Sequence, residues 1–267
     1  MVKNMHIKKL FDLKGKIAVV TGGSGYLGSA ITESLAEAGA FVYVTGRDVK
    51  KLQKFQKENS RKLNNLIQTI SLDILSEKSV KECFTKIKKD VKRIDILVNN
   101  ASYISTGTLE KLSDSNWNQG LNGTITGVFR CTKQVIPIME KNSAGTIINI
   151  SSIYGEVSPD PTIYAHTGFN NPPQYGAGKA AIIQFTKYCA CNLAHKGIRV
   201  NTISPGPFPK KEIQRNKQFI KNLTNKTPLG RIGKPDELKG AVVFLASEAS
   251  SFITGEVLHV DGGWTAW

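Results

Sequence analysis

Short apolar runs rich in β-branched residues alternate along the chain with stretches that have helical periodicity. The runs predict buried strands over residues 17–21, 41–45, 66–72, 94–98, 146–150, 198–203 and 257–260. The stretches between them predict helices over residues 29–38, 49–63, 76–89, 114–141, 175–196 and 235–246. Neither an internal repeat nor a linker interrupts the alternation. We therefore expect one α/β domain over residues 1–267, with a doubly wound parallel sheet of about seven strands, helices on both faces and a loose extension over residues 1–10.

The first predicted strand leads into a glycine-rich turn and then directly into a helix. Glycines let the backbone approach a pyrophosphate closely, and the free N–H groups at a helix start meet its negative charge. This order of strand, turn and helix is typical of a Rossmann-type dinucleotide-binding fold. The residues of the turn that we expect to bind the cofactor are Gly22, Ser24, Gly25, Tyr26, Leu27 and Gly28.

The second predicted strand is followed by Gly46, Arg47 and Asp48. In this fold an acidic residue about 20 residues after the glycines usually binds the ribose hydroxyls of NAD. Arg47 could instead pair with a 2′-phosphate and stack on adenine. Asp48 stands where it would serve as the N-cap of the next helix. These positions favour NADP(H) as the cofactor and leave NAD(H) possible.

Polar or small residues also follow the remaining strands, and in a parallel sheet the carboxyl ends of the strands form one edge where ligands bind. The amides of Asn99 and Asn100 can either brace neighbouring loops or line the cofactor cleft, and their spacing does not decide between the two. The other candidates at this edge are Asp73 with Ile74, Ala101, Ser151 with Ser152, and Pro205 with Gly206.

Tyr175 and Lys179 open the apolar helix that follows Pro172 and Pro173. Side chains four residues apart share one face of a helix. An isolated phenol has a pKa near ~10, which is too high for proton transfer at neutral pH. A neighbouring ammonium, helped by the helix N-terminus, favours the phenolate. We therefore expect a lowered pKa at Tyr175 and an acid/base role for this pair.

The formal net charge of +15 could attract anionic ligands or could reflect a lysine-rich solvated surface. No basic stripe with interleaved aromatic residues indicates nucleic-acid binding, and no run of apolar residues is long enough to span a membrane. Four irregularly spaced cysteines and the absence of a secretory h-region favour a reducing cytoplasmic location. Cys191 and His195 have i,i+4 spacing but lack further ligands, so we expect no metal site.

Taken together, these motifs resemble those of the short-chain dehydrogenase/reductase family, in its single-domain branch, over residues 11–267. The matching positions are Thr21-Gly22, Gly25, Gly28, Asp73, Asn99-Asn100-Ala101, Ser151-Ser152, Tyr175, Lys179, Pro205-Gly206 and the tail Val260-Asp261-Gly262-Gly263. The glycine spacing is more familiar in the extended branch of the family. The length and the tail fit the single-domain branch.

The resemblance implies roles for particular residues. Tyr175 would exchange a proton with the substrate while a hydride moves to or from the nicotinamide. Lys179 would hold the nicotinamide ribose and lower the tyrosine pKa, and Ser152 would hydrogen-bond the substrate oxygen. Asp73 would contact adenine, and Asn100 would line the adenosine ribose side. Where the family usually has a relay asparagine, this chain has Thr124, although Asn122 could be the substitute.

A third departure from the family is an insertion over residues 157–174, between Ser152 and Tyr175. A loop anchored in this way lies at or near the substrate mouth unless it packs on a neighbouring subunit. We expect His166, Asn170 and Asn171 from it to contact a polar substrate. Residues 208–227 could form a mobile cover.

These observations favour an oxidoreductase that interconverts a secondary alcohol and a ketone on a sugar-like or sugar-acid substrate. Gluconate 5-dehydrogenase-like members and members that modify bacterial surface sugars are the nearest in resemblance. A 3-oxoacyl carrier-protein reductase and a catalytically silent dinucleotide-binding scaffold are the alternatives. Family members usually form tetramers through the two long helices, so we expect a homotetramer or a homodimer.

Overall fold

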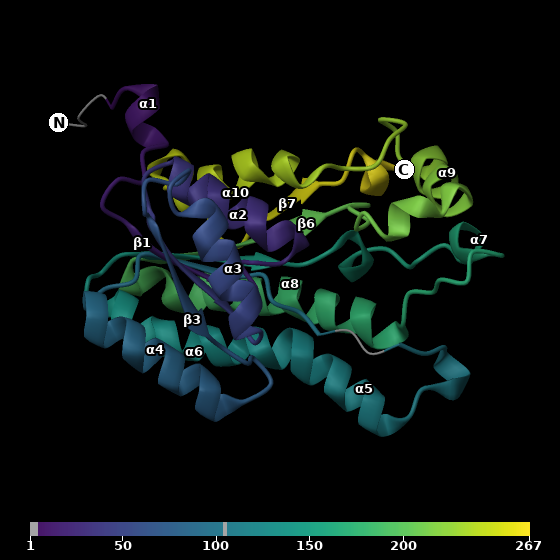
Figure 1. Cartoon of the computed structure of the whole chain (residues 1–267), viewed down its shortest axis with the longest axis horizontal. Coiled ribbons are helices and arrows are strands. Elements are labelled where there is room, and N and C mark those ends of the chain that lie inside the picture. Colours follow the sequence, from purple (N-terminus) through teal and green to yellow (C-terminus); the bar gives the residue numbers. More distant parts are fainter. Residues whose placement is uncertain (1–4, 104–105) are drawn as a thin grey trace.

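The apolar runs form a seven-stranded sheet in a computed structural model that describes residues 5–103 and 106–267 (Figure 1). The strands are β1 (Ile17–Thr21), β2 (Phe41–Gly46), β3 (Ile67–Ser71), β4 (Ile96–Asn99), β5 (Gly145–Ile150), β6 (Ile198–Pro205) and β7 (Val257–Val260). They pair in parallel in the spatial order β3-β2-β1-β4-β5-β6-β7. The strand order therefore reverses between β1 and β4, and the predicted fold class is confirmed.

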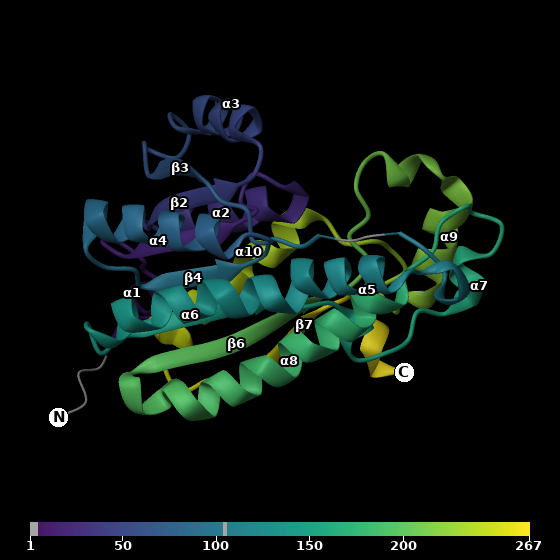
Figure 2. The ribbon, with the colours of Figure 1, turned by 90° about the horizontal axis from the view of Figure 1, so that it is seen from below.

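Helices cover both faces of the sheet (Figures 1 and 2). Helices α2, α3 and α10 contribute to the core on one face, and α4, α6 and α8 to the core on the other. The α-helices are α1 (Ile7–Leu10), α2 (Tyr26–Glu37), α3 (Val49–Asn59), α4 (Glu77–Val91), α5 (Asp114–Leu121), α6 (Gly127–Glu140), α7 (Pro161–Tyr164), α8 (Pro173–Leu193), α9 (Lys217–Lys226) and α10 (Lys239–Ala246). Residues 1–4 of the expected N-terminal extension lie outside the described part.

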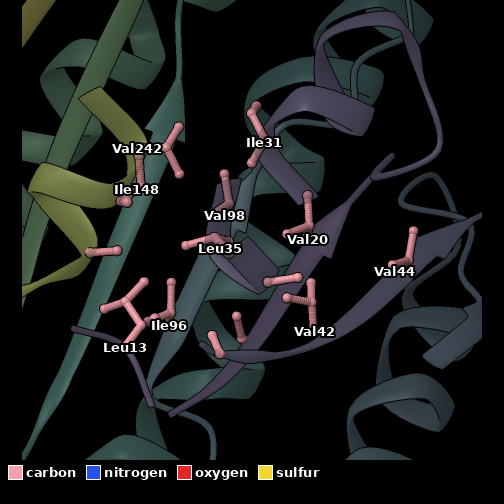
Figure 3. Packing of buried hydrophobic residues seen from close by; sticks show 14 of the residues in the cluster. Leu13, Val20, Ile31, Leu35, Val42, Val44, Ile96, Val98, Ile148 and Val242 are labelled. Atoms are coloured by element: carbon pink, nitrogen blue, oxygen red, sulfur yellow. The ribbon is translucent and has the colours of Figure 1, made fainter. Parts of the chain in front are cut away.

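Burial on both faces explains why the strands read as continuous apolar runs. Successive residues of a strand point to opposite faces, so Val20 joins the core under α2 and α10 whereas Val19 joins the core under α4 and α6. On the first face, Leu35 of α2 and Val242 of α10 pack over the strands (Figure 3). The sheet is thereby held rigidly between two helical layers, which fixes the positions of its strand ends.

The predicted helix over residues 114–141 is interrupted. A π-helical turn (Asn122–Thr126) separates α5 from α6. Glycine is required at Gly123, because a Cβ there would lie 2.4 Å from the Cβ of Tyr103. Periodicity alone could not show this turn, since the apolar pattern continues on both sides of it.

The insertion packs on its own chain, at the end of the molecule where α7 and α9 lie together (Figure 2). The ring of Phe219 in α9 lies 5.6 Å from Tyr164 and 5.0 Å from Phe169, measured between ring centroids. Lys226 pairs with Asp160 at 2.8 Å. The segment over residues 208–227 therefore includes a helix that is joined to the insertion by an apolar cluster.

Candidate active site

A cleft of about 620 Å³ lies at the carboxyl ends of the strands, where the strand order reverses. Its lining includes every residue that the sequence predicted for cofactor binding. These are Gly22, Ser24, Gly25, Tyr26, Leu27, Gly28, Arg47, Asp73, Ile74, Asn100, Ala101, Tyr175, Lys179, Pro205 and Gly206. Ser152 lines the same cleft. Ligands of open α/β sheets bind at this position.

The glycine-rich turn is built so that backbone, rather than side chains, faces the cleft. Gly22 has a φ of 64°, which favours glycine, and a Cβ at Gly28 would lie 2.1 Å from the carbonyl oxygen of Gly22. Gly25 is the N-cap of α2, and no side chain caps this helix. The N–H groups of its first turn are therefore left for an anionic ligand, which fits the pyrophosphate of a dinucleotide.

The two asparagines after β4 have different roles. The Asn100 amide donates to the carbonyl oxygens of Thr21 (2.9 Å) and Gly22 (3.2 Å), so it braces the glycine-rich turn and also lines the cleft. The Asn99 amide is buried and donates to Asn149 at 2.8 Å. The sequence left both roles open, and Asn100 combines them.

Arg47 and Lys51 line the end of the cleft next to β2, together with Asp48 and Asp73, and no carboxylate among the described residues forms an ion pair with Arg47. Asp48 caps α3 by accepting from the Lys51 N–H at 2.9 Å, as its position predicted. The Arg47 guanidinium lies 5.8 Å from the ring centroid of Tyr103. Sequence reasoning missed Lys51, which lies in the first turn of α3 just after the strand end, and Tyr103, which carries no local signal.

Ser152, Tyr175 and Lys179 meet at the other end of the cleft. The hydroxyls of Ser152 and Tyr175 share a hydrogen bond. The Lys179 ammonium lies 5.6 Å from the Tyr175 ring centroid and donates to the Ile150 carbonyl at 2.8 Å. Ser151 turns the other way and donates to the Lys179 backbone carbonyl at 2.8 Å, which ties α8 to the end of β5. The geometry supplies a phenol, a second hydroxyl and a cation at one point.

The expected lowering of the Tyr175 pKa is wrong for the protein without ligands. Burial raises the pKa of this phenol, and the hydrogen bond from Ser152 offsets only part of that effect. Burial also lowers the pKa of Lys179 to about 8. The Lys179 ammonium donates its hydrogen bond to the Ile150 carbonyl and not to the phenol oxygen. The i,i+4 spacing of the two residues therefore did not predict the direction of the Tyr175 pKa shift. The phenol of Tyr175 therefore keeps its proton at neutral pH.

Thr124 lies in the π-helical turn and does not line the cleft. Its hydroxyl donates to the Gly120 carbonyl at 2.6 Å, and a Cβ at Gly178 of α8 would lie 2.4 Å from it. Asn122, the alternative, accepts from the Arg130 guanidinium at 2.8 Å. Thr124 thus packs one residue away from Lys179, whereas Asn122 is held by α6.

The three insertion residues expected to contact substrate also lie outside the cleft lining. His166 is exposed with a φ of 59°, and the Asn170 amide donates to the Gly107 carbonyl at 2.9 Å. The Asn171 amide hydrogen-bonds the Tyr164 hydroxyl. The insertion therefore joins the loop after β4 to α9.

Within residues 5–103 and 106–267, no group of acidic, histidine or cysteine side chains could hold a metal ion, and no helix is long and apolar enough to cross a membrane.

Comparison with known proteins agrees with this geometry. A family profile described as enoyl-(acyl carrier protein) reductase matches residues 24–265. The 3-oxoacyl-(acyl-carrier-protein) reductase of Thermotoga maritima is 34% identical over 255 residues, which cover 94% of this chain and 98% of that protein. The corresponding enzyme of Vibrio harveyi is 37% identical over 258 residues, with coverage of 94% and 98%.

Solved structures give the same relationship. A gluconate 5-dehydrogenase from Burkholderia cenocepacia in complex with NADP and tartrate superposes with a TM-score of 0.89 at 31% identity, covering 98% of this chain and 100% of that chain. The RhlG/NADP active-site complex of Pseudomonas aeruginosa gives a TM-score of 0.86 at 31% identity, with coverage of 97% and 99%. The protein belongs to the short-chain dehydrogenase/reductase family and is an oxidoreductase of that family.

Proposed function

We propose that the protein interconverts a secondary alcohol and a ketone on a polar, sugar-like or sugar-acid substrate, with NADP(H) preferred over NAD(H). The observation that carries the proposal is the hydrogen-bonded pair of Ser152 and Tyr175 beside Lys179, at one end of a cleft. The other end presents Arg47, which forms no ion pair within the described part of the chain. When bound, the nicotinamide would supply or accept the hydride.

The chain's own residues handle the proton and the developing charge. Tyr175 donates its proton to the carbonyl oxygen as a ketone is reduced, and it accepts the proton in the reverse direction. Ser152 donates a hydrogen bond to the same oxygen and stabilises charge that develops there. Lys179 holds the nicotinamide ribose, and Thr124 is the candidate for a relay that returns protons from solvent through Lys179.

One structural neighbour supports the choice of a polar substrate. The polar residues of the insertion do not add to that support, because they lie outside the cleft lining, where Asn170 donates to the Gly107 carbonyl and Asn171 hydrogen-bonds the Tyr164 hydroxyl. A solved neighbour is a gluconate 5-dehydrogenase with tartrate bound. The curated relatives named above favour the second candidate, a 3-oxoacyl carrier-protein reductase.

A substrate panel separates the two candidates. Initial rates would be measured with NADPH and with NADH on 5-keto sugar acids, keto sugars and an acetoacetyl thioester. We expect the highest kcat/KM on a keto sugar acid with NADPH. Faster turnover of the thioester would establish the second candidate, and tight cofactor binding without turnover of any carbonyl would contradict both.

Arg47 tests the cofactor preference separately. We expect Arg47→Ala to weaken NADPH binding by about 10- to 100-fold, since hydrogen bonds to a charged group are lost, and to weaken NADH binding far less. Arg61→Ala removes an exposed arginine after α3 and serves as the matched control. Equal losses for both cofactors would mean that Arg47 does not contact the 2′-phosphate.

We also propose that α6 and α8 form the interface of a homotetramer or a homodimer. Phe129 on α6 is 46% exposed and Tyr188 on α8 is 62% exposed, which is unusual for large apolar side chains on packed helices. Light scattering should show a multiple of the monomer mass, and Phe129→Asp should reduce it.

A further inference from the structure

Arg47 and Tyr103 meet over the end of β1. Arg47 directly follows β2 and Tyr103 lies in the loop after β4, and these two strands flank β1 in the sheet. Both side chains line the cleft, and the guanidinium carbon lies 5.8 Å from the ring centroid. The pair therefore stands above the glycine-rich turn, at the adenosine end of the cleft.

The two members of the pair are held very differently. The Tyr103 N–H donates to the Gly123 carbonyl at 2.8 Å, and its hydroxyl donates to Gln119 at 3.4 Å. The missing Cβ of Gly123 makes room for the base of the tyrosine side chain, as described above. Arg47 has no ion pair among the described residues, so its guanidinium is the less constrained member of the pair, and the tyrosine is anchored through its backbone.

An aromatic face suits an arginine that must bind a phosphate. A carboxylate partner would occupy the N–H donors of the guanidinium and would also repel the incoming anion. A ring face attracts the cation through its quadrupole and leaves those donors unoccupied. Holding the side chain in place before binding also reduces the rotamer entropy that binding must overcome.

We infer that Tyr103 is a positioning residue that holds Arg47 for the 2′-phosphate and thereby strengthens the preference for NADP(H). The inference rests on the proposed contact between Arg47 and that phosphate. It assigns to the loop after β4, far from β2 in the sequence, a share of the cofactor selectivity.

The test compares Tyr103→Leu, Tyr103→Phe, Arg47→Ala and the double variant Arg47→Ala/Tyr103→Leu. Titration calorimetry would give dissociation constants for NADPH, NADH, 2′,5′-ADP and 5′-ADP. The last two ligands isolate the adenosine end from the nicotinamide. We expect Tyr103→Leu to weaken NADPH and 2′,5′-ADP by roughly two- to fivefold, the scale of an exposed cation–π contact, and to leave NADH and 5′-ADP unchanged.

Tyr103→Phe keeps the ring and loses only the hydroxyl, so it should bind all four ligands as the unmodified protein does. In the double variant, the loss caused by Tyr103→Leu should disappear, because the tyrosine acts only through Arg47. Should the leucine variant melt early in circular dichroism, Tyr103→Met fills similar space against Gly123 without an aromatic face.

The outcomes separate this inference from the cofactor assignment. If Arg47→Ala weakens 2′,5′-ADP and the leucine or methionine variant does not, the positioning role is wrong and the assignment stands. If the Tyr103 variants weaken NADH and 5′-ADP equally, Tyr103 contacts the adenosine directly and the inference is also wrong. If Arg47→Ala changes none of the four constants, the phosphate contact itself is wrong.

Discussion

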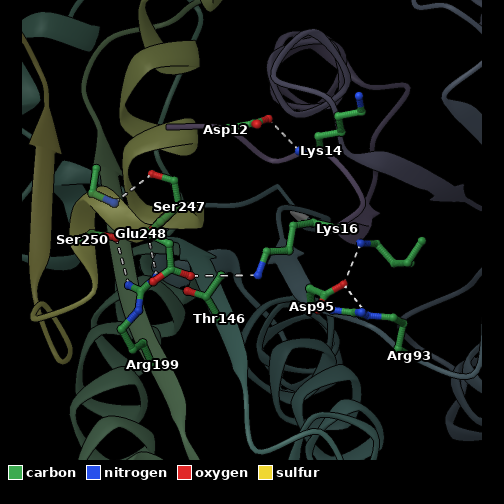
Figure 4. Close-up of polar contacts among 12 residues, drawn as sticks. Asp12, Lys14, Lys16, Arg93, Asp95, Thr146, Arg199, Ser247, Glu248 and Ser250 are labelled. Carbon is green, nitrogen blue, oxygen red and sulfur yellow. Dashed lines mark hydrogen bonds and ion pairs between the residues drawn. The ribbon is translucent and has the colours of Figure 1, made fainter. Parts of the chain in front are cut away.

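The two ends of the sheet each carry a cavity of comparable size, about 620 Å³ at the carboxyl end and about 560 Å³ at the amino end, and both contain charged residues. At the amino end the charges are paired within the protein (Figure 4). Asp95 accepts from the Ile17 N–H at 2.8 Å and pairs with Arg93, and Lys16 lies 3.9 Å from Glu248. Volume and charge therefore do not distinguish the two cavities.

What distinguishes them is the state of their polar groups. Arg199 at the amino end donates to the Ser250 hydroxyl and to the carbonyl of Leu245, each at 3.0 Å, so its guanidinium holds β6 to the end of α10 and to the segment after it. At the carboxyl end, Arg47 forms no ion pair with any residue that the structure describes, and α2 begins at an N-cap glycine that has no side chain to cap it. Polar groups in a folded protein are nearly always paired, because leaving them unpaired costs free energy. Charged or polar groups therefore indicate a ligand site only where no group of the protein itself pairs with them.

The largest effect that this contrast predicts is at Tyr175. Tyr175→Phe removes the proton donor and should lower kcat by about 10²- to 10⁴-fold, while the dissociation constant of NADPH stays nearly unchanged. Tyr188→Phe on the same helix is the matched control, because it keeps the ring that would face the proposed subunit interface and removes only the hydroxyl, so it should retain full activity. Single-turnover rates and cofactor titrations measure both quantities. Retained turnover in the Tyr175 variant would assign the acid/base to another residue.

The amino end should respond in stability rather than in catalysis. Asp95 is 6% exposed, and Asp95→Ala leaves the Ile17 N–H and the Arg93 guanidinium without their acceptor. We expect a loss of about 2 to 3 kcal/mol in the free energy of unfolding, measured by urea titration. Below the melting temperature, kcat and KM should be unchanged.

Glu58→Gln on α3 is the control for that experiment, because its ion pair with Lys54 is exposed and should contribute little. A change in KM caused by Asp95→Ala, without a change in stability, would make the amino-end cavity a functional site and would erase the contrast between the two ends.

The sequence predicted the sheet and the glycine-rich turn because their signals are local. A buried strand shows as an apolar run, and parallel topology brings strand ends together whatever the loops do, so Ser152 and Tyr175 could be placed at one edge. Contacts between loops could not be predicted in this way. Tyr103 meets Arg47 only because its loop rests on the π-helical turn at Gly123. The sign of the Tyr175 pKa shift also escaped prediction, because it depends on burial and not on helical spacing.

The smallest predicted effect is on the free energy of unfolding and concerns Lys179. It compares a buried charge at the carboxyl end of the sheet directly with Asp95 at the amino end. Its side chain is 4% exposed and its pKa is lowered to about 8 by burial, below the value of 10.5 for an unperturbed lysine. In the window between these two values the unfolded chain binds more protons than the folded chain, so the stability contributed by Lys179 rises as the pH rises from about 8 to 10.5. Below about pH 8 both states are protonated, and the cost of the buried cation is present in full.

Lys179→Met should therefore stabilise the ligand-free protein at pH 7 by about 1 to 2 kcal/mol, since loss of the hydrogen bond to Ile150 offsets part of the relieved desolvation. The advantage should shrink between pH 8 and 10. Urea titrations at several pH values measure it, and Lys187→Met, exposed on the same helix, should show no such trend. A destabilised Lys179→Met variant at pH 7 would mean that the lysine holds the fold together as Asp95 does. Lys179 would then stabilise the fold instead of lowering its stability, and the two ends of the sheet would no longer differ in this respect.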